Sequence, residues 1–284
     1  MKISNPERVI DPQSGVTKGE LADYVRAVAP LMLPWAANRP LSLVRCPQGR
    51  AKKCFFQKHS TGTFGPDVHQ IDIEEKKGEV VDYVYVKDQA GLMSCVQMGT
   101  IEFHGWGSST GDIEKPDRLV FDIDPDEGLG FEHVRKAARD LKDHLADMGL
   151  QTFPMLTGGK GIHVIVPLTP RAEWPEVKDF AMRFCVALAT AEPDRFTANL
   201  AKARRKGRMF LDYLRNQRGA TAILPFSARA REGAPVAAPI AWEELDEYAS
   251  GARFTVRDGA LLLERASSRT LQGWGEANQV LPDL

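Results

Sequence analysis

The hydrophobic pattern of this chain changes between helical and extended periods, which predicts a mixed fold of helices and strands. Apolar residues at three- and four-residue steps predict helices after Thr17, over 131–148 and over 174–190. Residues 92–98 fit either element, 241–250 suggest a short helix, and an extended stretch begins at Phe55. Short apolar or alternating runs bounded by turn residues predict strands at 41–45, 69–75, 79–87, 118–124, 152–156, 162–168, 209–214 and 220–226.

The order of these elements predicts the architecture. The first helix begins with a capping box, Thr17 to Glu20, and is expected to end at Pro30. From 118 to 226 the order is strand, helix, strand, turn, strand, helix, strand, strand, which predicts an α+β sheet with helices packed on it. Since no flexible linker is visible, we expect one bilobal unit with lobes over 1–115 and 116–258 and a tail over 259–284.

Composition restricts the class of protein without choosing a function. The 284 residues are 43% hydrophobic and 26% charged, with a net charge of −1, so any nucleic-acid surface must be a local basic patch. Neither a signal peptide nor a membrane-spanning apolar run is visible, so we expect a soluble cytoplasmic protein. The cysteines form no C-x-x-C pair, which disfavours a zinc ribbon and predicts buried free thiols; they are Cys46, Cys54, Cys95 and Cys185.

Two aspartates on one predicted strand are the most informative chemical feature. Asp122 and Asp124 share a face of the strand while Ile123 points to the core. Carboxylates whose Cα atoms lie roughly 7 Å apart repel unless a cation lies between them, and a hard divalent ion meets that need. Two solvated acids at a strand end are less favoured because apolar residues flank the pair. The segment 71–74 has the same alternation but leads into a charged hairpin tip, so we interpret it as a solvated edge.

Two further motifs point toward phosphate chemistry. The glycines of the turn 157–161 leave backbone N–H groups uncovered, while Thr157, Lys160 and His163 add a hydroxyl, a cation and an imidazole. The spacing is not that of a P-loop, and a glycine hairpin with an exposed lysine explains this turn equally well. Asp212 lies in an otherwise apolar strand, where a carboxylate is costly unless it is paired or binds metal. With Asp122 and Asp124 it makes the three carboxylates that suit a two-metal phosphoryl-transfer site.

Basic and aromatic residues accompany these motifs. Runs of cations are usually solvated, but on both sides of an acidic strand they suit the phosphates of a nucleotide or a strand. Phe55 and Phe56, near Lys52, Lys53, Lys58 and His59, offer a stacking platform, although core packing of at least one ring is the simpler alternative. The cations beside the Asp212 strand are Lys202, Arg204, Arg205, Lys206 and Arg208 before it and Arg215, Arg218, Arg229 and Arg231 after it.

The motifs at 121–125, 158–163 and 211–213 resemble, in order, the three catalytic motifs of archaeo-eukaryotic primase-type polymerases. The closer resemblance is to the polymerase domain of LigD-type proteins, the bacterial ATP-dependent ligases of non-homologous end joining. It extends from residue 4 to about 258 and is also carried by residues 4–8, 55–59, 99–104, 116–118 and 212–216. It implies a bilobal primase-polymerase fold and template-directed extension or gap filling, with ribo- or deoxyribonucleotides, at double-strand breaks. The implied partners are DNA ends, template-primer duplex, Ku and a DNA ligase domain or protein, in a nucleoid-associated setting.

The resemblance also implies residue roles. Asp122, Asp124 and Asp212 would be the catalytic residues and hold two divalent ions, manganese or magnesium. Phe55 and Phe56 would stack on the template. The residues implied to contact the incoming nucleotide are Thr157, Lys160, His163, Arg229, His104 and Arg205, and those implied to bind the 5′-phosphate of a DNA end are Asn5, Arg8 and Lys18. Arg8 stands where the family often has lysine, and Thr157 where serine is usual.

Three other functions remain as alternatives. A sugar-nucleotide glycosyltransferase would use the pair Asp122 and Asp124 but would leave Asp212 and the glycine turn unexplained. A non-catalytic DNA-end-binding module would not need all three acids. A primase that starts chains without a primer is compatible with every motif. No adenylation-lysine or nuclease motif is visible, so ligation and end trimming would need another domain or protein.

Overall fold

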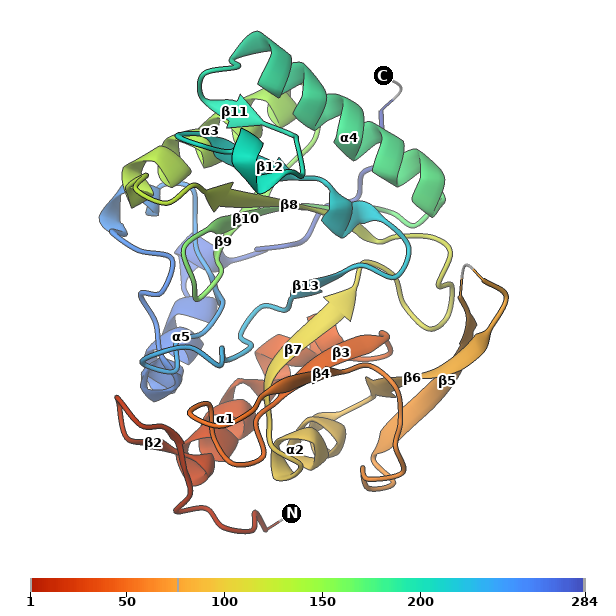
Figure 1. Ribbon diagram of the computed structural model, residues 1–284, viewed down its shortest axis with the longest axis vertical. Coiled ribbons are helices and arrows are strands. Elements are labelled where there is room, and N and C mark those ends of the chain that lie inside the picture. Colours follow the sequence, from red (N-terminus) through yellow and green to blue (C-terminus); the bar gives the residue numbers. More distant parts are fainter. Residues whose placement is uncertain (1, 76, 283–284) are drawn as a thin grey trace.

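Two larger sheets organise the molecule, one in the upper and one in the lower half of Figure 1. The computed structural model describes residues 2–75 and 77–282, together with the side chains of these residues except that of Lys202. The predicted hairpin over 69–87 is confirmed, while its tip at Lys76 lies outside the described residues. The α+β class is confirmed, since helices pack against predominantly antiparallel sheets.

The upper sheet has the strand order β11-β12-β8-β10-β9-β14. All neighbours are antiparallel except β11 and β12, which are parallel. The strands are β8 (Arg118–Pro125), β9 (Phe153–Leu156), β10 (Ile162–Pro167), β11 (Phe196–Thr197), β12 (Met209–Asp212) and β14 (Ala238–Pro239).

The lower sheet has the order β13-β7-β3-β4, and two hairpins accompany it. Its strands are β3 (Leu41–Arg45), β4 (Phe55–Gln57), β7 (Thr100–Trp106) and β13 (Thr221–Ile223), and the hairpins pair β1 (Val9–Asp11) with β2 (Val16–Thr17) and β5 (Val68–Glu74) with β6 (Val80–Val86). β13 follows the upper strands in sequence yet pairs with β7, so the chain crosses between the two sheets. The division into lobes at residue 115 stays a prediction.

In Figure 1, α3 and α4 lie at the top with the upper sheet, α1 and α2 lie at the bottom with the lower sheet, and α5 lies at the left edge. α3 contacts β8 and β10, α4 contacts β8, and α1 packs against α2, α5 and β7. The helices are α1 (Lys18–Ala36), α2 (Gln89–Gln97), α3 (Phe131–Asp147), α4 (Trp174–Ala191) and α5 (Gly259–Ala266), with 3₁₀ turns at Lys202–Arg204, Leu214–Asn216, Leu245–Glu247, Val256–Asp258 and Arg269–Leu271. No helix in the described ranges is both long enough and apolar enough to cross a membrane.

The prediction that the first helix ends at Pro30 is wrong. The capping box at Thr17 is present, but α1 continues through Pro30 and Pro34. Each proline removes one helical hydrogen bond, yet Val28 and Met32 are fully buried here, and tertiary packing outweighs local propensity.

Two other predictions about helices are settled by the structure. The ambiguous segment 92–98 lies mostly within α2, which Asp88 caps through Gly91 N. The short helix expected over 241–250 is wrong, because this segment forms only the turn Leu245–Glu247. There the Glu244 carboxylate accepts from Ala241 N and pairs with Arg265, so these local and tertiary bonds hold the chain without a longer helix.

The prediction of four free thiols is wrong for two of the cysteines. Cys95 and Cys185 are buried and free, as expected. Cys46 and Cys54 form a disulfide, because the antiparallel pairing of β3 with β4 brings their Cα atoms to 4.4 Å. The eight-residue sequence separation gave no indication of this pairing.

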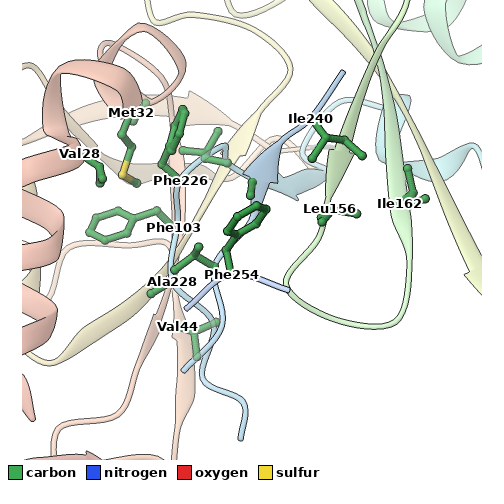
Figure 2. Packing of buried hydrophobic residues seen from close by; sticks show 14 of the residues in the cluster. Val28, Met32, Val44, Phe103, Leu156, Ile162, Phe226, Ala228, Ile240 and Phe254 are labelled. Atoms are coloured by element: carbon green, nitrogen blue, oxygen red, sulfur yellow. The ribbon is translucent and has the colours of Figure 1, made fainter. Parts of the chain in front are cut away.

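A continuous hydrophobic core joins the two sheets. Figure 2 shows Met32 of α1 near Phe103 of β7 and Phe226, and it shows Leu156 and Ile162 further along the same cluster. Because both sheets and α1 share this core, the strands that carry the polar motifs are held in one packed unit.

Strand β8 separates the core from the polar face. Phe121 packs on Phe184 of α4 with ring centroids 5.2 Å apart, and Leu119 and Ile123 are fully buried. Alternation therefore places Asp122 and Asp124 on the face away from α4, where apolar packing does not cover them.

Candidate active site

The register of three neighbouring strands brings acidic and imidazole side chains together. Asp122 of β8 pairs directly with Asp212 of β12 on one side and with His163 of β10 on the other. Directly opposed residues of antiparallel strands point to the same face, so these three side chains form a row across the sheet. Asp124 lies two residues further along β8 and therefore on the same face.

Two arginines approach the acids. Arg215 Nη2 lies 3.0 Å from Asp122 Oδ2, and Arg215 Nε lies 3.4 Å from Asp212 Oδ2. Arg205 Nη1 lies 3.8 Å from Asp124 Oδ2. The guanidinium of Arg215 is thus placed between the two acids that face each other across the strands.

The three carboxyls have different affinities for protons. Burial alone would raise the pKa of Asp122, but His163 and Arg215 hold that pKa well below its ordinary value. Burial and the charge of Asp122 raise the pKa of Asp124, and burial raises that of Asp212 despite Arg215. Repulsion from Asp122 adds to both increases, after the effect of burial.

The glycine turn after β9 lies against this row. Gly158 adopts φ +67°, and a Cβ there would meet Arg229 Cγ at 2.7 Å, while a Cβ on Gly161 would meet Ile123 O at 2.5 Å. Glycine is therefore required at Gly158 for the turn to pack against Arg229 and at Gly161 for it to approach β8. The Thr157 hydroxyl donates to Gly161 O at 3.0 Å and closes the turn, and Lys160 remains exposed.

A buried ion cluster supports the other side of the site. The Glu102 carboxylate accepts from Ala230 N at 2.8 Å and from Arg229 Nε at 3.1 Å, and it lies 2.7 Å from His104 Nε2. Arg229 Nη1 also donates to Thr157 O at 2.6 Å, which links the cluster to the glycine turn. Burial lowers the pKa of His104, while these partners lower that of Glu102 to about 2 although burial opposes the shift.

One cavity of about 230 Å³ gathers most of the residues predicted to be catalytic or to contact the nucleotide. Asp212 and Arg205 adjoin it through Arg215 and Asp124. Its lining comprises His104, Asp122, Asp124, Thr157, Gly159, Lys160, Gly161, His163, Arg215, Ile223, Arg229 and Arg231.

Sequence reasoning missed two contributors to this site. Glu102 was not selected, although its alternation with His104 places both on one face of β7 and was a usable signal. Arg215 was noted only as one of several basic residues, and its position between two acids depends on strand pairing that periodicity does not reveal.

The predicted template platform lies beside the cavity. Phe56 is 69% exposed and Phe55 is 40% exposed, so neither ring is packed in the core. The Phe56 ring lies 5.8 Å from the His104 ring, centroid to centroid. The core-packing alternative for these two rings is therefore not supported.

The predicted 5′-phosphate residues form a separate group. Arg8 and Lys18 line one small crevice at the start of α1, and Asn5 has a left-handed backbone with φ 49°. Lys18 Nζ donates to Ser4 O at 3.0 Å and to Gln97 O at 2.8 Å. Burial and, to a lesser extent, the nearby charge of Arg8 lower the pKa of Lys18.

A larger cavity of about 750 Å³ lies elsewhere, between α1 and the segment 266–276. Trp35, Arg118 and Trp274 line it, and none of the predicted site residues does. Size alone is a weaker indicator than a convergence of acids and cations, so we favour the smaller cavity as the active site.

The donor set of the acidic row fits hard divalent cations. Carboxylate oxygens are the preferred ligands of such ions, and Asp122, Asp124 and Asp212 share one face of the sheet. In residues 2–75 and 77–282, no group of three His, Cys, Asp or Glu side chains is close enough as it stands to hold an ion. A cation is nevertheless already present between two of the acids, in the form of Arg215.

Comparisons with known proteins show which family of proteins the chain is similar to. The family model of the LigD primase-polymerase domain matches residues 17–269. The multifunctional non-homologous end joining protein LigD of Pseudomonas aeruginosa is 40% identical over 257 residues, which are 90% of this chain and 30% of that protein. LigD of Mycolicibacterium smegmatis is 33% identical over 247 residues, 86% of this chain and 32% of that protein. The chain thus spans about a third of the length of these curated relatives.

A solved structure resembles nearly the whole chain. The polymerase domain from Mycobacterium tuberculosis Ligase D, in complex with DNA, superposes with a TM-score of 0.88 at 29% sequence identity. The match covers 97% of this chain and 98% of that one. The expected primase-polymerase fold is therefore confirmed.

Proposed function

The chain belongs to the LigD primase-polymerase domain family, and on that premise we propose that it is a template-directed nucleotidyltransferase that extends primers and fills gaps at broken DNA ends. The observation that carries the proposal is the register of β12, β8 and β10, which sets Asp212, Asp122 and His163 in one row beside Asp124. The glycine turn and Lys160 border the same cavity, where the triphosphate of an incoming nucleotide would lie.

The residues of the site divide the chemistry between them. Divalent ions held by Asp122, Asp124 and Asp212 would supply the charge that activates a primer 3′-hydroxyl and stabilises departing pyrophosphate. Lys160 and Arg229 would neutralise the triphosphate, and His163 and Thr157 would position it. Arg205 and His104 complete the set of proposed nucleotide contacts, from either side of the acids. Phe55 and Phe56 would stack on the template, as their exposure supports.

A direct assay tests this function against its alternatives. The chain is incubated with a gapped, 5′-phosphorylated duplex and Mn²⁺ or Mg²⁺, with ribonucleotides and deoxyribonucleotides in parallel. Template-matched addition at the primer 3′ end is expected with both nucleotide types. Failure of extension alongside tight binding of the duplex would favour the end-binding module, and products formed without a primer would favour the primase. Transfer of sugar from a nucleotide sugar would favour the glycosyltransferase.

Arg8 and Lys18, which lie together at the start of α1, support a second part of the proposal, recognition of a 5′-phosphate. Arg8 and Lys18 are two cations that repel each other, and a bound phosphate dianion would relieve this repulsion. Arg8 Nη1 donates to Pro47 O, which orients the guanidinium, and its other nitrogens would bind the phosphate. Asn5 precedes them in a left-handed turn.

Arg8→Gln is expected to remove most of the preference for 5′-phosphorylated over 5′-hydroxyl ends. A charge-assisted hydrogen bond contributes roughly 1.5–3 kcal/mol, so the ratio of the two dissociation constants should fall about tenfold or more. Fluorescence anisotropy with two duplexes that differ only in this phosphate measures the ratio. Arg26→Gln is the matched control, since Arg26 pairs with Asp23 on the surface of α1. An unchanged ratio in Arg8→Gln would remove this residue from the proposed pocket.

We also propose further domains and partners, because the chain matches only part of each curated relative. Because the chain spans about a third of the curated LigD proteins, we propose that ligation is supplied by a DNA ligase domain or protein and that Ku recruits the polymerase to ends. Action on chromosomal breaks would place the protein in the cytoplasm at the nucleoid.

A further inference from the structure

Arg215 contacts two of the three acids of the proposed metal site. Its Nη2 and Nε lie 3.0 and 3.2 Å from the same oxygen of Asp122, and Nε lies 3.4 Å from Asp212 Oδ2. Asp122 and Asp212 are the directly opposed pair of β8 and β12, so the guanidinium fills the space between their carboxylates. This is the space that a cation shared by the two acids would take.

The charges on this face explain why a cation belongs there. Asp122, Asp124 and Asp212 carry three negative charges, whereas only Arg215 and Arg205 lie within 4 Å of them as permanent cations among the described residues. Without Arg215, Asp122 and Asp212 would face each other largely buried, with side chains 17% exposed. Asp122 would keep His163, whose Nε2 lies 3.4 Å from Asp122 Oδ1, but no guanidinium would lie between the two acids. Close burial of two like charges is strongly unfavourable.

The backbone of Arg215 is held firmly while its side chain can leave. Neighbouring Asn216 is buried and bonds to both Val120 N and Val120 O, at 2.7 and 2.9 Å. The Arg215 side chain is 39% exposed, and its bond outside the acids is a long one, from Nη1 to Thr221 O at 3.3 Å. Because the side chain is partly exposed, it can move toward solvent if a divalent ion displaces the guanidinium.

We propose that Arg215 is an internal cation that occupies the position between Asp122 and Asp212 and competes with divalent ions for these carboxylates. The inference rests on the proposed function, since it assumes that the same acids hold the metal. Arg215 stabilises the metal-free site, and each binding event must first break its ionic hydrogen bonds. Metal affinity is thereby lowered, and Arg215 acts as a positioning residue that keeps the acids in place until ions arrive.

The test is Mn²⁺ binding by the whole chain, measured by calorimetry without nucleotide or DNA. Arg215→Met is expected to bind Mn²⁺ more tightly than the wild type, by about tenfold, because two coupled binding events typically change each other's affinity 5- to 150-fold. Arg215→Lys retains a charge and should lie between the two. Arg218→Met is the matched control, because Arg218 is also an arginine of this segment but pairs with Glu114.

Thermal unfolding supplies an independent readout. In EDTA, Arg215→Met should melt below the wild type because the two acids repel, and saturating Mn²⁺ should raise its Tm by more than it raises that of the wild type. If Arg215 had a merely structural role, its substitution would lower Tm in EDTA without increasing the affinity for Mn²⁺. Competition is therefore supported only if Arg215→Met both melts at a lower temperature in EDTA and binds Mn²⁺ more tightly.

The possible results of these measurements separate the competition by Arg215 from the existence of the metal site. Mn²⁺ affinity that is equal or weaker in Arg215→Met, with a normal Arg218→Met, overturns the competition and leaves the proposed metal site intact. Absence of Mn²⁺ binding in the wild type and in both Met variants overturns the competition and the metal site together. Binding by Arg215→Met alone would support competition in its strongest form.

Discussion

Asp122→Asn is expected to lower primer extension by roughly a thousandfold or more, since metal-held charge supplies several kcal/mol of transition-state stabilisation. The same loss is expected for Asp124→Asn. Both variants keep the size of the side chain and remove its charge, so the fold and the distant crevice of Arg8 and Lys18 should be preserved. Extension of a gapped duplex with Mn²⁺ and anisotropy with a 5′-phosphorylated end measure the two properties separately.

A matched control comes from the segment 71–74, where acids alternate with apolar residues as they do on β8. Asp72→Asn changes an exposed acid on β5, which pairs only with β6, and should extend primers at the wild-type rate. Near-normal extension by Asp122→Asn would remove this residue from the catalytic site. Loss of end binding together with extension would instead indicate that the substitution damages the fold.

Glu102→Gln is expected to destabilise the protein by about 3 kcal/mol, the low end of the cost of removing one partner from a buried ion pair. The glutamine can still accept from Ala230 N, but Arg229 is left without its compensating charge. Because Arg229 also holds Thr157 O, the glycine turn should loosen and the KM for nucleotide should rise. Urea unfolding gives the stability, and steady-state extension gives the KM.

The pH dependence of stability distinguishes loss of the ionic interaction of Glu102 from a nonspecific loss of packing. The folded-state pKa of Glu102 is about 2, below its ordinary value of 4.5, so its contribution is present above pH 4.5 and is lost as pH falls toward 2. The difference in unfolding free energy between wild type and Glu102→Gln should therefore shrink across that interval. Glu114→Gln is the control, because Glu114 is 51% exposed and its pair with Arg218 should contribute at most about 1 kcal/mol. A difference independent of pH would contradict the ionic role of Glu102.

Much of the secondary structure could be predicted because it depends on neighbours in sequence. The strands around Asp122 and His163 and the helices over 131–148 and 174–190 are found within one or two residues of their expected bounds. The first helix was predicted too short, because its passage through Pro30 depends on burial of α1 by the rest of the molecule.

The roles assigned to the site residues remain predictions. The positions of these residues in the structure, however, can be compared with those that the sequence predicts. The sequence alone placed Asp122 and Asp124 on one face, since side chains alternate along any strand. It named Asp212, His163 and Arg229 by residue type and motif, without indicating which strands pair or in what register. The pairing that sets Asp212 and His163 on either side of Asp122 is an interaction between segments up to 90 residues apart.

What the sequence by itself determined is local: which residues form strands and helices, which acids share a face, and where glycine permits a tight turn. Only the tertiary structure decided that Arg215 lies between Asp122 and Asp212, that Glu102 joins His104 to Arg229, and that Cys46 meets Cys54. The physical reason is that charge compensation and strand register minimise the free energy of the whole packed chain, whereas periodicity reports only the environment of each element.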